Sequence, residues 1–473
     1  MRNIFLISLL VLYSTTAWAQ VPGHWEGTAE VNGKPLLIIF NISSTGVEHF
    51  SATMDVPAQG AKGLPCDEVS SEGDSLFIAI KMIKGRYAGQ FNADRSAIKG
   101  TLRQGTFTTV LNLKRTGEAT ALNRPQTPQP PFPYISEEVE YDSPDKSVHL
   151  GGTLTKPKGT GSFPAAILIT GSGAQDRDET LMGHKPFWVI ADYLTRRGVA
   201  VLRVDDRGMG KSVGPPQGTS ADFALDVITS LDFLKSRADI NPKKIGLIGH
   251  SEGGMIAPMV AVARPQDVAF IVSLAGPGEK ITDLMVQQNV ATLKSVQVSA
   301  PIAEGYGAMM GSIMTAAAFE KDTTQAYQKA TVAYADWKKT VHPNVAAMLT
   351  GVADSTGVAS YIRTLVGTLR TPWMRYFLAY DPTENLTRLT CPVLVLNGEK
   401  DIQVLAGPNL AGWEAALKKA ENKEATVREI PGLNHLFQHC QACTVAEYSE
   451  LTETFAPEAL QMIGDWLTEH VLR

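Results

Sequence analysis

The most constraining feature of the sequence is a serine, Ser251, placed between a short apolar run and a segment rich in small residues. Residues 245–248 are typical of a buried strand, and residues 253–263 can form a helix that packs closely on a sheet. In a strand–turn–helix of this kind the serine has a strained backbone that lifts its hydroxyl above the sheet edge, so the residues two before and two after it must be small. Gly249 and Gly253 meet this requirement. We therefore expect Ser251 to be a nucleophile.

The same Gly-x-Ser-x-Gly pattern occurs a second time, at residues 210–214 around Ser212. A polar loop separates this serine from the preceding strand at 199–204. Two prolines, Pro215 and Pro216, stand where the first turn of a helix should begin. The flanking sequence therefore excludes Ser212 as the nucleophile.

Length and charge set broad limits on the protein. A chain of 473 residues with 44% hydrophobic residues is long enough for two or three folded domains. The formal net charge of -5 provides no extensive basic surface, which argues against nucleic acid as a partner. A neutral or mildly polar small molecule is the expected substrate.

The first 19 residues are typical of a secretory signal peptide. Arg2 precedes an apolar run at residues 4–12, and Ala17-Trp18-Ala19 forms an A-x-A cleavage site. This run is too short to span a bilayer, and no later apolar stretch reaches that length. We expect export to the periplasm or the outside, with no stable membrane anchor.

Residues 20–118 predict a small all-β domain. Apolar and polar residues alternate in runs such as 76–80 and 87–91, with Gly, Asn and Asp clusters between them. The spacing favours a barrel or sandwich of about seven or eight strands. No titratable side chains gather there, which favours an accessory role. Residues 119–133 contain five prolines and predict a stiff linker.

Residues 134–473 predict an α/β catalytic domain, because strand-like and helix-like runs alternate along it. Residues 139–155 should supply the first, antiparallel strands. The expected parallel strands and crossover helices cover residues 165–170, 186–197, 199–204, 222–237, 244–249, 253–263 and 269–274.

The alternation stops between about residues 279 and 375, where helical spacing continues without a strand. We expect a helical cap inserted into the sheet domain at this point. The sheet should then resume at residues 392–397 and 426–430, and an amphipathic helix at 457–470 should end the domain.

A serine hydroxyl needs a base and an orienting carboxylate to become a good nucleophile at neutral pH. Asp401 and His435 each follow a predicted strand and come after Ser251 in the order expected for an α/β-hydrolase. Glu399 and His439 are the nearest competitors for the two roles. We expect Ser251, His435 and Asp401 to form a catalytic triad, with the backbone N–H groups of Glu252 and of Ser172 or Gly173 as the oxyanion hole. Four residues at the end of the cap are candidates for the substrate pocket: Trp373, Met374, Tyr376 and Phe377.

Two further groups of residues have structural interpretations. The charged runs at 176–178 and 205–208 are expected to brace loops by ion pairing. His435, His439, Cys440 and Cys443 resemble a zinc-ligand set, but four ligands within nine residues do not match the usual spacing. A local disulfide between Cys440 and Cys443, or two thiols, is favoured over zinc.

Four motifs together resemble secreted bacterial carboxylesterases of the α/β-hydrolase superfamily, in the branch related to dipeptidyl and acylaminoacyl peptidases. The motifs lie at residues 170–178, 206–212, 249–254 and 433–437, and the resemblance covers about residues 134–470. It implies cleavage of short acyl esters by Ser251, Asp401 and His435, with no metal or other cofactor. Two alternatives stay open: a serine aminopeptidase or acylaminoacyl peptidase, and a non-catalytic exported protein that binds glycans.

Overall fold

A computed structural model describes residues 21–31, 33–46, 49–117, 123–352 and 354–472. The predicted signal peptide, residues 1–19, lies outside the described residues. The chain divides into two compact units, one ending at Asn123 and the other beginning at Arg124, a boundary that falls inside the predicted linker.

The N-terminal unit is a single antiparallel sheet, which confirms the all-β prediction. Its strands follow the order β4-β3-β2-β1-β10-β8-β7-β6-β5, with β9 paired to β8. Their bounds are β1 Gly23–Val31, β2 Lys34–Gly46, β3 His49–Val56, β4 Ala61–Cys66, β5 Glu68–Glu72, β6 Ser75–Ile80, β7 Gly85–Phe91, β8 Ala97–Gln104, β9 Phe107–Val110 and β10 Leu113–Thr116.

The described part of this sheet has ten strands, more than the seven or eight expected from the sequence. The additional strands include short ones with little apolar alternation: neither β4 nor β9 has a fully buried side chain. Strands β3 and β5, which are far apart in the sheet order, pack together, so the sheet curls around a core that includes Trp25, Phe40 and Tyr87.

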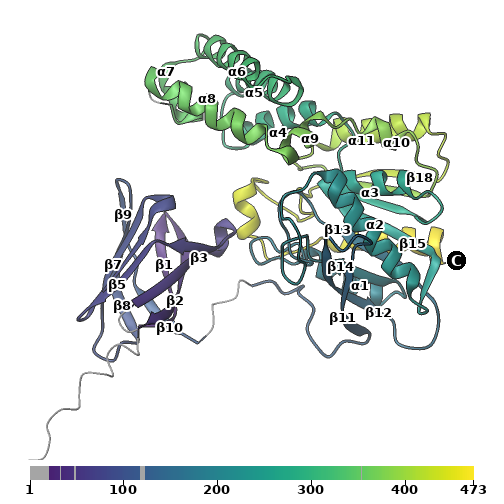
Figure 1. Ribbon diagram of the computed structural model, residues 1–473, viewed down its shortest axis with the longest axis horizontal. Helices are drawn as coiled ribbons and strands as arrows, with labels where there is room; N and C mark the ends of the chain where they lie inside the picture. Colours follow the sequence, from purple (N-terminus) through teal and green to yellow (C-terminus); the bar gives the residue numbers. More distant parts are fainter. Residues whose placement is uncertain (1–20, 32, 47–48, 118–122, 353, 473) are drawn as a thin grey trace, which may run out of the picture. The chain divides into compact units, whose positions relative to one another are not determined.

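The second unit is built on an eight-stranded sheet in the order β11-β12-β14-β13-β15-β16-β17-β18 (Figure 1). Strands β11 and β12 are antiparallel to their neighbours, as expected for residues 139–155, and the remaining pairs are parallel. The bounds are β11 Ile135–Asp142, β12 His149–Lys156, β13 Phe163–Ile169, β14 Ala200–Val204, β15 Ile240–His250, β16 Ile271–Leu274, β17 Val393–Gly398 and β18 Ala425–Ile430.

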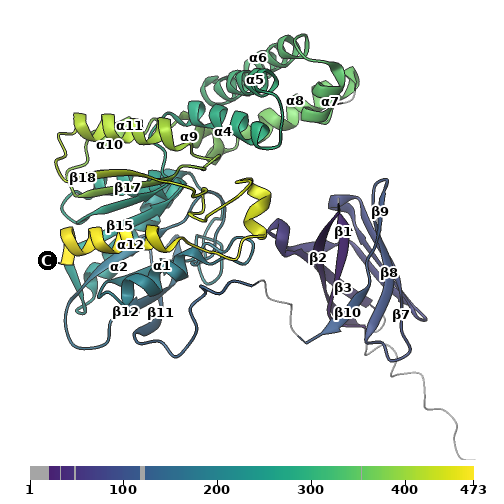
Figure 2. The same ribbon diagram turned by 180° about the vertical axis from the view of Figure 1, so that it is seen from behind.

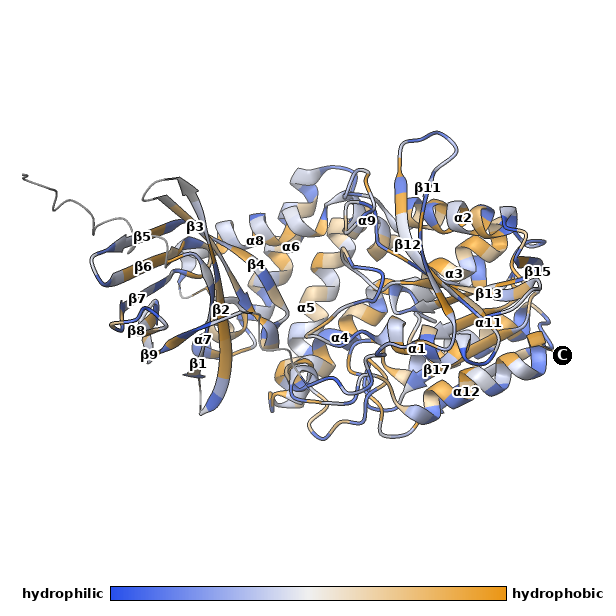
Figure 3. Ribbon diagram, turned by 90° about the horizontal axis from the view of Figure 1, so that it is seen from below, coloured by the Kyte–Doolittle hydropathy of each residue, from blue (hydrophilic) through white to orange (hydrophobic). Residues whose placement is uncertain are grey.

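Helices cover both faces of this sheet (Figure 2). One face is covered by α2 Ser220–Ser236, α3 Glu252–Ala263 and α11 Ala406–Lys419, and the other by α1 Pro186–Thr195 and α12 Pro457–Leu467. Because side chains alternate along a strand, Ile167 of β13 joins the first core and Leu168 joins the second. Figure 3 shows the hydrophobic residues gathered along these strands and on the helix faces against them.

The expected cap is present as a run of helices between β16 and β17 (Figure 1). Its helices are α4 Ile281–Ser295, α5 Ala300–Phe319, α6 Thr323–Lys338, α7 Pro343–Thr350, α8 Ser355–Leu369 and α9 Pro372–Ala379, followed by α10 Thr383–Leu386. Met255 of α3 and Val404 pack into the apolar core of the cap. The cap therefore contacts the sheet domain at Met255, four residues after Ser251. Within the described residues no helix has both the length and the apolar character needed to cross a membrane.

Part of the predicted linker is fixed to the second unit. Arg124 donates hydrogen bonds to the carbonyl oxygens of Leu451 and Met182 at 2.9 and 2.8 Å, and Gln126 Nε2 donates to the carbonyl of Phe455 at 2.7 Å. Hydrogen bonds from the Arg124 and Gln126 side chains to distant carbonyl groups cannot be inferred from a proline-rich composition. The attachment of this part of the linker to the second unit could therefore not be predicted from the sequence.

Candidate active site

Ser251 lies between the last residue of β15 and the first residue of α3. Its backbone has φ 54° and ψ -117°, a left-handed φ that residues other than glycine rarely adopt. Its N–H donates to the carbonyl of Leu274 in the neighbouring strand at 2.8 Å, which holds the turn against the sheet. The strained turn expected from the sequence is therefore present.

The two glycines of the motif are required by backbone contacts. A Cβ on Gly249 would lie 2.0 Å from the carbonyl oxygen of Gly253, and a Cβ on Gly253 would lie 2.1 Å from the carbonyl oxygen of Ile169. These neighbours are main-chain atoms and cannot rotate away. Both positions therefore require glycine because α3 lies so close to β15 and β13.

The second serine motif has a different role. Ser212 is only 4% exposed, and its Oγ donates to the carbonyl of Asp205 at 2.7 Å while accepting from Gly151 N at 2.9 Å. Its hydroxyl is thus used in joining the loop to β12, in agreement with its exclusion as a nucleophile.

His435 and Asp401 are brought together at the ends of β18 and β17. His435 Nδ1 lies 2.7 Å from Asp401 Oδ2, and both side chains are buried. The other carboxylate oxygen, Asp401 Oδ1, accepts from the backbone N–H groups of Gln403 and Val404 at 2.7 and 2.9 Å. These bonds fix the carboxylate, which in turn orients the imidazole so that Nε2 is its remaining acceptor when the ring is neutral.

The competing residues are used elsewhere. Glu399 is exposed, accepts from Gly432 N at 3.0 Å and pairs with Lys400. The hydrogen bond from Gly432 and the contact with Lys400 lower the pKa of the Glu399 carboxyl. His439 contacts Glu453 and Glu458 rather than Asp401.

A buried pair behind Ser251 was not anticipated from the sequence. His250 Nδ1 lies 2.9 Å from Glu179 Oε1, and His250 Nε2 lies 3.0 Å from the carbonyl oxygen of His435. A carbonyl can only accept, and a carboxylate accepts, so both ring nitrogens donate in the imidazolium form. Burial lowers the pKa of the His250 imidazole, but the charge and hydrogen bonds of Glu179 and the bond to His435 outweigh it, and the pKa lies above its ordinary value. The residue before the serine thus connects Glu179 to the backbone of His435.

The same carboxylate oxygen, Glu179 Oε1, also accepts from Gly171 N at 2.7 Å. A Cβ on Gly171 would lie 3.2 Å from Cβ of Ser251, so the loop after β13 passes directly beside the serine. Glu179 therefore positions this loop and, through His250, the segment that carries His435. Only the adjacency of His250 to Ser251 is visible in the sequence, and no local pattern links it to Glu179.

The structure distinguishes between the candidate donors of the oxyanion hole. Glu252 is the first residue of α3, where a backbone N–H has no partner within the helix. Ser172 lines the cavity that contains Ser251 and His435, whereas Gly173, with φ 100°, lines other cavities. Of the two candidates in the loop after β13, Ser172 is therefore the one that borders the same cavity as Ser251.

The cavity at Ser251 has a volume of about 250 Å³ and is called the Ser251 cavity below. Trp373, Met374 and Phe377 of α9 line it, as expected, but Tyr376 does not. In a helix, positions 373, 374 and 377 share one face and position 376 turns away from it, which the aromatic composition alone did not reveal.

A family model described as the alpha/beta hydrolase family matches residues 166–447, which is more than half of the chain. The chain belongs to this family. The fold predicted from the sequence is thereby confirmed for the second unit, which is called the hydrolase unit below.

Among curated relatives, Esterase EstD of Thermotoga maritima is 30% identical over 189 residues, covering 39% of this chain and 45% of that protein. The uncharacterized protein YfhR of Escherichia coli K12 is 28% identical over 124 residues, covering 26% of this chain and 41% of that protein. The chain thus spans less than half the length of these relatives.

Solved structures similar to this chain include the esterase PF2001 of Pyrococcus furiosus, with a TM-score of 0.42 and 15% identity over 75% of this chain and 100% of that chain. Est1E of Butyrivibrio proteoclasticus, solved with ferulic acid bound, has a TM-score of 0.39 and 16% identity over 71% of this chain and 100% of that chain.

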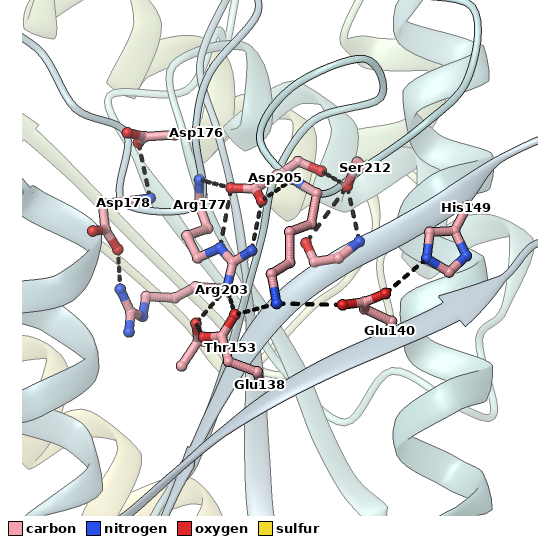
Figure 4. A network of polar contacts seen from close by, with 12 residues as sticks. Glu138, Glu140, His149, Thr153, Asp176, Arg177, Asp178, Arg203, Asp205 and Ser212 are labelled. Atoms are coloured by element: carbon pink, nitrogen blue, oxygen red, sulfur yellow. Dashed lines mark hydrogen bonds and ion pairs between the residues drawn. The ribbon is translucent and has the colours of Figure 1, made fainter.

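The charged runs of the hydrolase unit brace the loop after β13, as expected (Figure 4). Arg177 pairs with Asp205 at 2.6 Å and with Glu138 at 2.8 Å, and Asp178 pairs with Arg203. Figure 4 shows this network running from the loop across the hairpin of β11 and β12 to His149. Strand β11 and the end of β14 thus fix the loop whose first residues lie beside Ser251.

Asp206 completes this bracing with a carboxyl group that is largely withdrawn from water. It accepts from the Thr170 hydroxyl and from Gln175 N, both at 2.8 Å. Burial raises the pKa of the Asp206 carboxyl to about 7, and these two hydrogen bonds oppose the rise.

The cysteine-rich segment after His435 does not assemble the four-residue zinc set considered above. Cys440 and Cys443 form a disulfide. His435 is turned toward Asp401, and His439 is turned toward Glu453 and Glu458. The two cysteines are therefore bonded to each other, and the two histidines have different carboxylate partners.

Proposed function

We propose that the protein is a serine carboxylesterase that cleaves short acyl esters through Ser251, His435 and Asp401. The observation that carries the proposal is the 2.7 Å contact between His435 Nδ1 and Asp401 Oδ2, with His435 lining the same cavity as the strained Ser251. This arrangement matches the roles of nucleophile, base and orienting carboxylate.

In the first half of the proposed reaction, His435 Nε2 removes the proton of the Ser251 hydroxyl as Oγ attacks the ester carbonyl carbon. The carbonyl oxygen becomes an oxyanion, which the N–H groups of Glu252 and Ser172 would stabilise. The imidazolium then returns the proton to the leaving alkoxide, so an alcohol departs and an acyl-serine ester remains.

In the second half, water attacks the acyl-serine carbonyl while His435 accepts one of its protons. The tetrahedral intermediate collapses, the acid leaves, and His435 returns the proton to Ser251 Oγ. Each removed oxyanion donor is expected to cost about 3 kcal/mol of transition-state stabilisation, because donors fixed before the reaction need no reorganisation.

Two observations support ester rather than aminopeptide cleavage. EstD, one of the relatives, is named an esterase. Glu252, which is the acidic side chain nearest to Ser251 in sequence and could hold a substrate amino group, already accepts from Ser220 Oγ and Trp373 Nε1 at 2.5 and 3.0 Å.

The proposal includes export. The signal-peptide pattern of residues 1–19 supports a periplasmic or extracellular location, and the Cys440–Cys443 disulfide fits an oxidising compartment. Fractionation of cells that express the full chain, with N-terminal sequencing of the product, tests this part.

The function is tested by comparing hydrolysis of p-nitrophenyl esters with hydrolysis of aminoacyl p-nitroanilides, together with labelling by a fluorophosphonate. We expect ester turnover, a label on the peptide that contains Ser251, and no label on the peptide that contains Ser212. Ser251→Ala should lower kcat by about 10⁶-fold. Faster turnover of the anilides would favour the peptidase, and absence of both label and turnover would favour the non-catalytic alternative.

A further inference from the structure

A second cavity lies beside the Ser251 cavity in the hydrolase unit. It has a volume of about 320 Å³ and is called the side cavity below. Its lining is largely apolar and includes Phe223, Pro216 and Pro372, with Asp206 and Arg207 as charged residues. Arg207 pairs with Asp226 at 2.7 Å, so its charge is already compensated. An apolar group therefore fits this space better than an anion.

Trp373 is the residue shared by the linings of the two cavities, as far as the described residues define them. The loop after β13 divides them in the same way, because Ser172 lines the Ser251 cavity and Gly173 lines the side cavity. The indole of Trp373 thus forms a wall between the two cavities. On the side of the Ser251 cavity this wall faces the same space as Ser172, whose N–H is a proposed oxyanion donor.

This wall is held from the sheet side of the molecule. Trp373 Nε1 donates to Glu252 Oε1 at 3.0 Å, and the same oxygen accepts from Ser220 Oγ at 2.5 Å. Glu252 is only 2% exposed, so moving the indole would remove a hydrogen bond from a buried carboxylate. The ring also stacks on Phe377, with 5.3 Å between centroids and 13° between planes. A cap residue is therefore fixed by the residue that follows the nucleophile.

We infer that Trp373 is a specificity-determining residue. Its indole separates the Ser251 cavity from the side cavity and so restricts the acyl chain of the ester to a short one. The inference rests on the proposed cleavage of short acyl esters and adds the residue that sets the limit on acyl length. Truncation of the indole would join the two cavities and roughly double the space available to an arm that starts at Ser251.

The test uses p-nitrophenyl acetate, butyrate, octanoate and dodecanoate with the full chain. For the unmodified protein, kcat/KM should fall from butyrate to dodecanoate. Trp373→Ala should raise the ratio of kcat/KM for dodecanoate to that for acetate by at least about 10-fold, because each added methylene gains a place to bury. Trp373→Phe keeps a ring but lacks the indole N–H, and it should give a smaller increase.

Two variants distinguish access to the side cavity from a general enlargement of the Ser251 cavity. Met374→Ala enlarges the Ser251 cavity from the same helix but does not border the side cavity, so the chain-length ratio should change less than threefold, on the order of one small contact. Gln217 is exposed and lines the side cavity, and Gln217→Trp in the Trp373→Ala background should fill it and reverse the gain.

Failure of the inference can be told apart from failure of the proposed function by labelling. A short-chain and a long-chain alkyl fluorophosphonate each lose fluoride when Ser251 Oγ attacks phosphorus, so the two labelling rates report access without turnover. If neither reagent labels Ser251, the esterase proposal fails. If both label Ser251 and Trp373→Ala or Trp373→Phe leaves the ratio of rates unchanged, or if the unmodified protein already prefers dodecanoate, the role of Trp373 is wrong.

Discussion

His250 Nε2 lies 3.0 Å from the carbonyl oxygen of His435, so the residue that precedes the serine holds the backbone of the proposed base. The other ring nitrogen of His250 contacts Glu179, whose carboxylate also accepts from Gly171 N. One buried carboxylate thereby connects two segments that are far apart in the sequence. The geometry of the proposed triad depends on this support as well as on the three side chains themselves.

Glu179→Gln should lower kcat for a short ester by about 10–100-fold with little change in KM, because a hydrogen bond to a charged group contributes about 1.5–3 kcal/mol. Both bonds end on the same oxygen, Glu179 Oε1. The neutral amide oxygen accepts them more weakly than a carboxylate does, and it no longer favours the His250 imidazolium. Steady-state kinetics with thermal melting of the same samples checks this. Glu424→Gln changes an exposed glutamate and should leave kcat unaltered. An unchanged kcat in a folded Glu179→Gln protein would contradict the positioning role.

Asp401→Asn should lower kcat by about 10⁴-fold, since the amide cannot hold His435 in the required tautomer. Glu399→Gln is the matched control, because Glu399 lies two residues away on the same loop but is exposed and bonded to Gly432 N. It should retain nearly full activity. Equal losses in the two variants would show that the loop, and not the Asp401 carboxylate, is what matters.

Gly249→Ala should lower the free energy of unfolding of the hydrolase unit by at least about 3 kcal/mol, because the new Cβ would meet a main-chain oxygen at 2.0 Å. Gly407→Ala is the control: nothing lies within 4 Å of a Cβ placed there, and alanine favours the helix. Thermal or urea unfolding of both proteins measures the difference. Similar stabilities would mean that α3 does not approach β15 as closely as described.

Asp206 gives a pH dependence of stability with a definite sign. Its pKa is about 7 in the folded protein, above the ordinary value of 3.8, so the folded state binds the proton more tightly than the unfolded state. Stability should therefore fall as pH rises from about 4 to about 7, by on the order of 4 kcal/mol from this group.

Asp206→Asn cannot ionise, so this variant should lose that part of the pH dependence and become relatively more stable above pH 7. Melting temperatures of both proteins from pH 4.5 to pH 8.5 give the comparison. Parallel curves for the two proteins across this range would contradict a raised pKa at Asp206.

Much of the hydrolase unit could be predicted from local patterns. The alternation of strands and helices and the glycines around Ser251 each follow from backbone constraints between residues close in sequence, which leave a pattern in a few consecutive residues. The order of Ser251, Asp401 and His435 along the chain carried the triad hypothesis for the same reason. In contrast, weakly alternating edge strands such as β4 left no such signature, and the strand count was too low.

The sequence by itself determined which residue types stand at the ends of which strands, and hence that Ser251, Asp401 and His435 could meet at one sheet edge. Only the tertiary structure decided that Glu179 and His250 support them, that Ser172 rather than Gly173 borders the Ser251 cavity, and that Trp373 lies against Glu252 while Tyr376 turns away. The physical reason is the distance along the sequence over which each kind of interaction acts. Strand, turn and helix preferences act between neighbours in sequence, whereas buried ion pairs and cavity walls depend on side chains that only folding of the whole unit brings together.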